Sequence, residues 1–139
     1  PIDPWFIKEV DPSNSQLIST ARLVNDELPS KVVLRIRKAL REIPSPHIVA
    51  VGAAYKANSE DTRESPALEI VDLLRHDGYR VDHYDPLVQD MKFPSTITEA
   101  CSGADCLLLL VEHDAVMREI AAGRQEIEEA MRHSLIMRF

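Results

Sequence analysis

Three short apolar runs, each separated from the next by a helical pattern, constrain this chain more than any other feature. The runs cover residues 47–52, 79–84 and 106–111, and the first and third are almost entirely apolar. Such runs are typical of strands buried on both faces of a parallel sheet. Residues 134–139 form a fourth run that fits a last, short strand. Strands that alternate with helices predict an α/β fold, with a mostly parallel sheet and helices on both of its faces.

The helices between the runs have recognisable ends. Ser65 and Pro66 predict a helix start, with Ser65 as the N-cap and Pro66 in the first turn, and Gly78 predicts its end. Further helices are expected over residues 97–101, 114–120 and 125–133.

The first 45 residues read as an extended segment followed by a long helix. Three prolines in residues 1–12 predict extended chain, and residues 13–16 resemble a capping box that starts a helix at Ser13. Apolar residues recur every three or four positions from Leu17 to Ile43, enough for a helix of roughly 45 Å. Pro29 predicts a kink, or two helices end to end. The helix is either part of the core or a connection between domains or subunits.

Charge divides the chain at the same place. The net charge is −7, which argues against a nucleic-acid groove because such a groove needs a dominant basic face. Residues 1–45 hold 7 basic and 6 acidic groups, whereas residues 46–139 hold 9 and 17. We therefore expect a connecting segment over 1–45 and a folded domain over 46–139. An anionic ligand of that domain needs a local cluster of donors.

Composition excludes several classes of protein. With 45% hydrophobic and 28% charged residues in 139, the chain is not disordered. It has no apolar run near the ~20 residues of a membrane span and no signal peptide. Cys101 and Cys106 make neither a disulfide framework nor a zinc pattern. We expect a cytoplasmic protein with no metal, and the first residue, Pro1 rather than Met, suggests processing or a piece of a longer chain.

The connection over residues 53–65 is the strongest candidate for a site. It is longer than the usual ~2–6 residues of such loops, and it follows a strand at the edge where open α/β sheets bind ligands. Tyr55 offers a face for a base, Lys56 a point charge, and the following helix free N–H groups. The alternative is a solvated loop whose charges pair internally, namely Lys56, Asp61, Arg63 and Glu64.

Other motifs give weaker indications of a functional site. The dinucleotide fingerprint Gly-x-Gly-x-x-Gly is absent, since only Gly52 stands after the first strand, and this argues against a nicotinamide site within these residues. The segment 112–114, Glu-His-Asp, is a candidate base or metal site, although exposed polar residues are common at strand ends. Trp5 and Phe6 are expected to anchor the N-terminal segment.

Two stretches together resemble the UDP-glucose/GDP-mannose dehydrogenase family. They are Pro1–Ile7 (PIDPWFI) and Gly52–Ala67, which contains Tyr-Lys and Arg-Glu-Ser-Pro; Asp85-Pro86 and Ala21–Asp26 match as well. The resemblance covers nearly the whole chain. It implies a Rossmann-like domain that binds the nucleotide of a UDP-sugar, preceded by the long central helix, with an NAD-binding domain outside the chain and a homodimer formed through the helix.

The resemblance also implies site residues and a reaction. Family enzymes oxidise the sugar C6 alcohol to a carboxylate in two NAD-dependent steps, through a cysteine thiohemiacetal and thioester. The motif places that cysteine just before Pro1 and assigns Asp3 to positioning or activating the hydrolytic water. Tyr55 and Lys56 match positions that contact the UDP-sugar, and Arg63 matches one that reaches NAD. A chain without the cysteine and the NAD domain is expected to be inactive alone.

Departures from the pattern define the alternatives. Ile2 stands where the UDP-glucose branch usually has Lys, which favours UDP-N-acetylmannosamine as the substrate over UDP-N-acetylglucosamine or UDP-glucose. The family's late Asp-x-Arg segment has no counterpart before Phe139. A stand-alone nucleotide- or phosphometabolite-binding module, and an interaction protein whose long helix dimerises, remain as competing interpretations.

Overall fold

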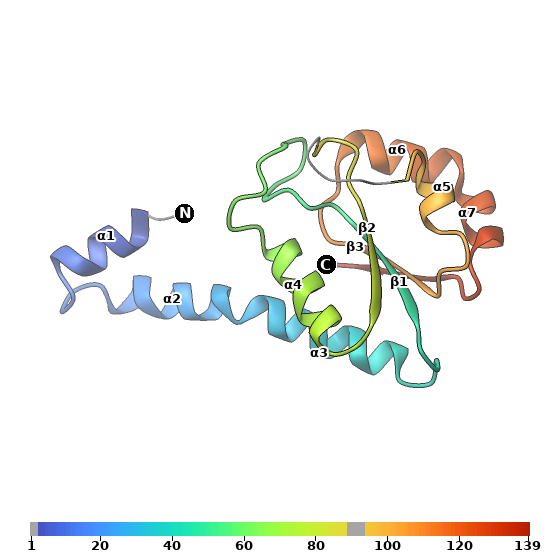
Figure 1. The fold of residues 1–139 in the computed structure, drawn as a ribbon. Coiled ribbons are helices and arrows are strands. Elements are labelled where there is room, and N and C mark those ends of the chain that lie inside the picture. The colour runs from blue at the N-terminus through green and yellow to red at the C-terminus, as the bar shows by residue number, and fades with distance from the viewer. Residues whose placement is uncertain (1–2, 89–93) are drawn as a thin grey trace.

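A four-stranded parallel sheet forms the centre of the molecule (Figure 1). The computed structural model describes residues 3–88 and 94–139, and for Asp3 the backbone only. The strand order is β2-β1-β3-β4, and all three pairings are parallel. This confirms the α/β, Rossmann-like fold. The strands are β1 (His47–Val51), β2 (Arg80–Tyr84), β3 (Cys106–Leu109) and β4 (Leu135–Arg138).

Helices cover both faces of the sheet (Figure 1). On one face lie α3 (Leu28–Leu40) and α4 (Pro66–His76). On the other lie α5 (Ile97–Ala100), α6 (Asp114–Ala122) and α7 (Arg124–Ala130).

Strand side chains divide between two hydrophobic cores. In β1, Val49 and Val51 pack with α5–α7, and Ile48 and Ala50 pack with α3 and α4. The residues of β3 alternate in the same way, and every residue of both strands is buried. Successive side chains of a strand point to opposite faces. Two covered faces therefore require the nearly continuous apolar runs seen in the sequence.

The N-terminal segment differs from expectation. The structure places a helix, α1 (Asp3–Val10), where extended chain was predicted, and residues 1–2 lie outside the described part. Pro4 does not prevent this, because the first turn of a helix needs no N–H from it. The capping box is also wrong, since α2 (Gln16–Asp26) has Ser15 as its N-cap. The Ser13 hydroxyl donates instead to Asp11 at 2.9 Å.

The predicted kink is present. α2 and α3 together span 25 residues and bend by 31°, with Pro29 in the first turn of α3. α3 buries an apolar stripe against the sheet, but no residue within α2 is buried, and α2 projects from the body (Figure 1). Leu17, Leu23 and Val24 of α2 are exposed. Within residues 3–88 and 94–139, no helix has the length and apolar character to cross a membrane.

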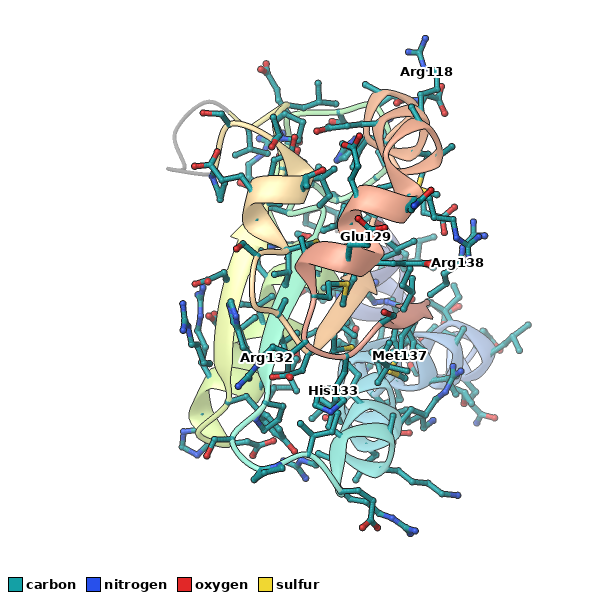
Figure 2. All side chains as sticks on the ribbon, turned by 90° about the vertical axis from the view of Figure 1, so that its right-hand side faces the viewer. Arg118, Glu129, Arg132, His133, Met137 and Arg138 are labelled. Carbon is teal, nitrogen blue, oxygen red and sulfur yellow. The ribbon has the colours of Figure 1, made fainter. Side chains whose placement is uncertain are left out.

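A buried carboxylate joins the amino ends of β1 and β3. Asp105, fully buried, accepts hydrogen bonds from the His47 N–H (2.7 Å), the His133 ring (2.8 Å) and the Arg132 guanidinium. Burial raises its pKa, but these hydrogen bonds outweigh burial and hold the pKa of Asp105 below its ordinary value. Arg132 and His133 follow α7 side by side (Figure 2). α7 ends at Ala130, before the predicted His133, because both residues turn back to this carboxylate.

Candidate functional site

The sheet reverses its winding between β1 and β3. From β1 the chain crosses through α4 to β2 on one side, whereas β3 continues to β4 on the other. Ligands of open α/β sheets bind beyond the carboxyl ends of the strands at such a point. The segment 53–65 leaves β1 there, beside residues 110–111 that follow β3. The N–H groups of Leu110 and Val111 both donate to the Val51 carbonyl, at 3.0 and 3.1 Å.

Gly52 allows the two strand ends to approach. Its φ of +89° lies in the left-handed region, and a Cβ there would lie 2.6 Å from the Val111 carbonyl oxygen. Only glycine fits such a close backbone approach. The candidate loop therefore starts from a point fixed against β3.

Asp85 holds the start of the loop. Its carboxylate is fully buried after β2 and accepts hydrogen bonds from the N–H groups of Ala53 (2.7 Å) and Ala54 (3.3 Å) and from the His113 Nε2 (3.0 Å). In the sequence, Asp85-Pro86 stood out only as a match to the family. Its position directly after a strand, at the carboxyl edge, was the signal that it holds this site together.

His113 holds the middle of the loop. The ring is fully buried, and its Nδ1 accepts the Asn58 N–H at 2.9 Å. The three polar residues of the 112–114 motif do not converge. Glu112 pairs with Arg138, whereas Asp114 accepts from the Asn58 amide at 2.9 Å. Among the described residues no cluster could hold a metal ion.

Tyr55 and Lys56 lie between the part of the loop that Asp85 holds and the part that His113 holds. The Tyr55 N–H donates to the Asp61 carbonyl at 2.7 Å, and its ring is 42% exposed. Lys56 is exposed and makes no hydrogen bond or ion pair within the described part of the chain. Ser65 is the N-cap of α4 as predicted, but its hydroxyl donates to the Ala54 carbonyl at 3.1 Å and caps no N–H of the helix.

Arg63 is held within the loop by hydrogen bonds to Asp61. Its guanidinium donates to both carboxylate oxygens of Asp61, at 2.9 and 2.7 Å, while the side chain stays 88% exposed. The Arg63 hydrogen bonds lower the pKa of Asp61 to about 2. The interpretation of internal ion pairing thus holds for Arg63 but not for Lys56. The role of Arg63 toward NAD stays a prediction.

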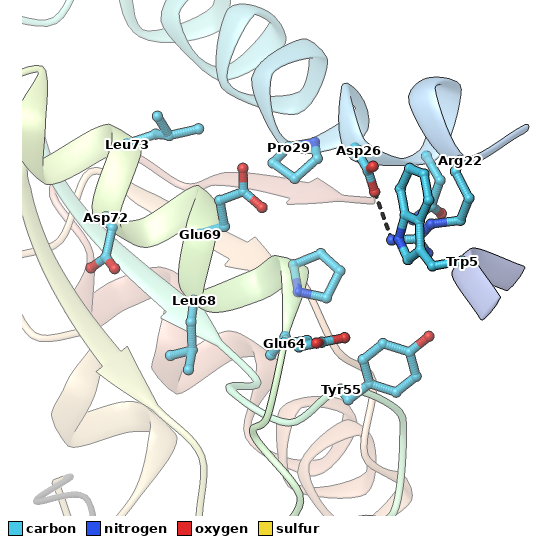
Figure 3. A pocket seen from close by; sticks show the side chains of 13 residues that line it. Trp5, Arg22, Asp26, Pro29, Tyr55, Glu64, Leu68, Glu69, Asp72 and Leu73 are labelled. Atoms are coloured by element: carbon cyan, nitrogen blue, oxygen red, sulfur yellow. Dashed lines mark hydrogen bonds and ion pairs between the residues drawn. The ribbon is translucent and has the colours of Figure 1, made fainter. Parts of the chain in front are cut away.

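Two pockets meet at the loop, and both are lined by Tyr55, Pro29 and Pro66. The larger, about 630 Å³, lies between α1, α2 and the start of α4 (Figure 3). We call it the acidic pocket, because its lining includes four carboxylates, Asp26, Glu64, Glu69 and Asp72. Arg22, the one basic lining residue in the described part of the chain, is paired with Asp26 (Figure 3).

The smaller pocket, about 290 Å³, is the apolar pocket. Among the described residues Arg35 is its one charged lining residue, and it stacks on Phe139, 4.8 Å from the ring centroid. The remaining lining is apolar: Leu28, Pro29, Val32, Ala54, Tyr55, Pro66, Ala67, Ile70, Leu110 and Val111. Its charge and its place beside β1 and β3 suit a planar ring with an anionic group better than the acidic pocket does.

The N-terminal candidates lie apart from the loop in sequence. α1 begins at Asp3, whose side chain is outside the described part, so its assigned role stays a prediction. Trp5 lines the acidic pocket opposite Tyr55 (Figure 3). The Lys8 ammonium and the Arg22 guanidinium lie 4.7 and 5.8 Å from its ring centroid, distances typical of cation–π contacts.

Relatives share both the sequence and the fold. UDP-N-acetyl-D-mannosamine dehydrogenase of Methanococcus maripaludis is 41% identical over 116 residues, covering 81% of this chain and 27% of the relative. The enzyme of the same name from Methanococcus aeolicus is 36% identical over 139 residues, 98% of this chain and 32% of the relative. The solved UDP-D-ManNAc dehydrogenase of Pyrococcus horikoshii superposes with a TM-score of 0.84 at 28% identity, over 98% of this chain and 32% of that one.

The chain spans about a third or less of the length of each of these relatives. The model of the UDP-glucose/GDP-mannose dehydrogenase family, UDP binding domain, matches residues 49–138. That range holds the sheet, apart from the first two residues of β1, and the loop at its carboxyl edge. The chain therefore belongs to the UDP-glucose/GDP-mannose dehydrogenase family and carries its UDP binding domain.

Proposed function

We propose that this chain is the substrate-binding part of an NAD-dependent dehydrogenase that oxidises the C6 alcohol of a UDP-sugar to the carboxylate. Lys56, which forms no hydrogen bond or ion pair with the described residues, stands beside the half-exposed Tyr55 at the carboxyl edge of the sheet, and this arrangement carries the proposal. The names of the relatives from Methanococcus and Pyrococcus favour UDP-N-acetylmannosamine as the sugar nucleotide.

The uracil ring is assigned to Tyr55 and the apolar pocket, and the diphosphate to Lys56 in the loop. The Tyr55 ring and the apolar lining accept the uracil ring, because such surfaces bind flat aromatic groups. Lys56 forms a point charge for the diphosphate, since an exposed ammonium that makes no ion pair with the described residues is available to an anionic ligand. The acidic pocket repels the diphosphate and so directs it to the other side of Tyr55.

NAD would supply the hydride acceptor, and the residues of this chain would touch only its edge. Within residues 3–88 and 94–139 no glycine-rich turn cradles a dinucleotide. Arg63 fits an edge contact, because Asp61 binds two of its nitrogens and its side chain remains open to solvent. Asp3 would orient the water that releases the oxidised sugar from the enzyme.

Assembly and location belong to the same proposal. The exposed apolar residues Leu17, Leu23 and Val24 on α2 favour a homodimer with a second copy of this helix. Sedimentation that shows a monomer at high concentration would refute the dimer. Two free thiols, Cys101 and Cys106, both buried, are typical of a cytoplasmic protein.

Calorimetry with UDP tests the binding half of the proposal. Lys56→Ala is expected to weaken UDP binding at least tenfold, about 1.4 kcal/mol. Lys38→Ala removes the same charge from an exposed position in the last turn of α3, away from the loop, and should bind UDP as the wild type does. Equal affinity of both variants would remove Lys56 from the site.

Activity of the protein that contains this chain tests the catalytic half. NADH formation is measured with UDP-N-acetylmannosamine, UDP-N-acetylglucosamine and UDP-glucose as substrates. We expect the highest kcat/KM with UDP-N-acetylmannosamine. UDP binding without NADH formation from any of the three would favour a nucleotide-binding module instead.

A further inference from the structure

We propose that His113 and Asp85 are positioning residues that clamp the loop 53–65 in the conformation in which Tyr55 and Lys56 receive a ligand. This rests on the proposed function, because it names what holds that site in place. Neither residue lines the acidic or the apolar pocket. Both act through the backbone of the loop.

The hydrogen bonds of His113 show which ring nitrogen carries the proton. The Asn58 N–H points at Nδ1 at 2.9 Å, so Nδ1 is the acceptor and carries no proton. The ring proton is then on Nε2, which donates to an Asp85 carboxylate oxygen at 3.0 Å. The ring is a neutral link that joins a carboxylate on one strand end to an N–H in the loop, and the opposite tautomer would break both hydrogen bonds.

The clamp grips the loop on both sides of the two binding residues. Before Tyr55, the N–H groups of Ala53 and Ala54 donate to the same Asp85 oxygen that accepts from His113. After Lys56, the Asn58 N–H donates to His113. Only three residues lie between Ala54 and Asn58, which leaves little freedom for the segment between them.

Asn58 has features of a fixed point rather than of a solvated turn. Its φ is +58°, a left-handed conformation that asparagine tolerates. Its amide exchanges two hydrogen bonds with Asp114: Nδ2 donates to the carboxylate at 2.9 Å, and Oδ1 accepts the Asp114 N–H at 3.0 Å. The loop is thus attached to the start of α6 through side chain and backbone together.

Substitutions at position 113 separate the two bonds. His113→Phe removes both at similar volume. His113→Asn keeps an acceptor near the place of Nδ1, and His113→Gln keeps a donor near the place of Nε2. His76→Phe, at an exposed histidine in the last turn of α4, is the matched control.

We expect His113→Phe to weaken UDP binding at least tenfold and to speed amide hydrogen exchange of Asn58 at least tenfold. His113→Asn should restore most of the protection of Asn58, and His113→Gln should not. In the protein that contains this chain, His113→Phe should raise KM for the UDP-sugar more than it lowers kcat. Unchanged UDP affinity and exchange in His113→Phe would overturn the clamp.

A measurement on the wild type needs no variant. NMR should show a scalar coupling across the hydrogen bond from the Asn58 nitrogen to Nδ1 of His113, with the ring proton on Nε2. The opposite tautomer would overturn the clamp even if UDP binds. A wild type with the coupling but without UDP binding would refute the proposed function while supporting the clamp on the loop.

Discussion

Replacing Gly52 by alanine tests whether the close approach of β1 and β3 is the structural basis of the site. Gly52 and Gly78 have nearly equal φ values, +89° and +88°. A Cβ at Gly78 meets nothing within 4 Å, whereas one at Gly52 would lie 2.6 and 2.7 Å from the Val111 carbonyl oxygen and nitrogen. The pair therefore separates left-handed strain from steric overlap.

The two costs follow from this geometry. Left-handed backbone at a non-glycine residue costs about 1–2 kcal/mol, which is the expected loss for Gly78→Ala. At Gly52 the colliding atoms are backbone, so no rotamer change relieves them. Val111 must move, and with it the two N–H groups bonded to the Val51 carbonyl. Together with the left-handed strain, about 1 kcal/mol for each of the two hydrogen bonds and about 1–3 kcal/mol for the displaced packing give an expected loss of roughly 4–7 kcal/mol for Gly52→Ala.

Urea denaturation followed by far-ultraviolet circular dichroism measures both losses. A loss of that size is a large part of the about 5–15 kcal/mol that stabilises an ordinary domain, so Gly52→Ala is expected to be largely unfolded in mild urea. Free energies of unfolding of the two variants that agree within about 0.5 kcal/mol, the usual size of a surface effect, would refute the steric argument.

Three further predictions follow from buried and paired groups. Leu107→Ala should lower the free energy of unfolding by about 2–5 kcal/mol, since the side chain is fully buried in the core of the sheet. Cys101 and Cys106 should resist a thiol reagent until the protein unfolds, because burial raises the pKa of each thiol to about 12. Arg63→Ala should return the pKa of Asp61 from about 2 toward 3.8 by NMR titration. Because the folded pKa is the lower one, the stability that this pair provides is present above 3.8 and is lost as the pH falls toward 2.

The sheet was predictable because strands that are buried on both faces have a recognisable amino-acid composition. Strands covered on both faces require apolar residues at every position, and the sequence runs at 47–52 and 106–111 show this directly. The kink at Pro29 was predictable for a similar reason, since proline acts through its own ring.

The wrong predictions lie where one local pattern competes with another, and the missed link joins residues that are distant in sequence. The first 12 residues looked extended because of their prolines, although one of them stands where a helix accepts it. Ser13 fits a capping box, but the Asp11 carboxylate takes its hydroxyl. In the site, the 53–65 loop could be found from its length, whereas the link from Asp85 to His113 joins residues 28 apart in sequence. Asp85 follows a strand and His113 lies in the 112–114 motif, but neither position alone indicates that the two side chains meet.

The strand order has a consequence for how this chain folds. β1 is central, and its partners are reached only after long crossovers, so Ile48 pairs with Cys106 across nearly sixty positions. No hairpin exists in the sheet to form early and locally. Chains dominated by such distant pairings fold slowly, because a large loop must close before any strand contact is made. The buried faces of β1 and β3 are then exposed for longest during folding, and chaperone capture or aggregation should begin at these two apolar segments.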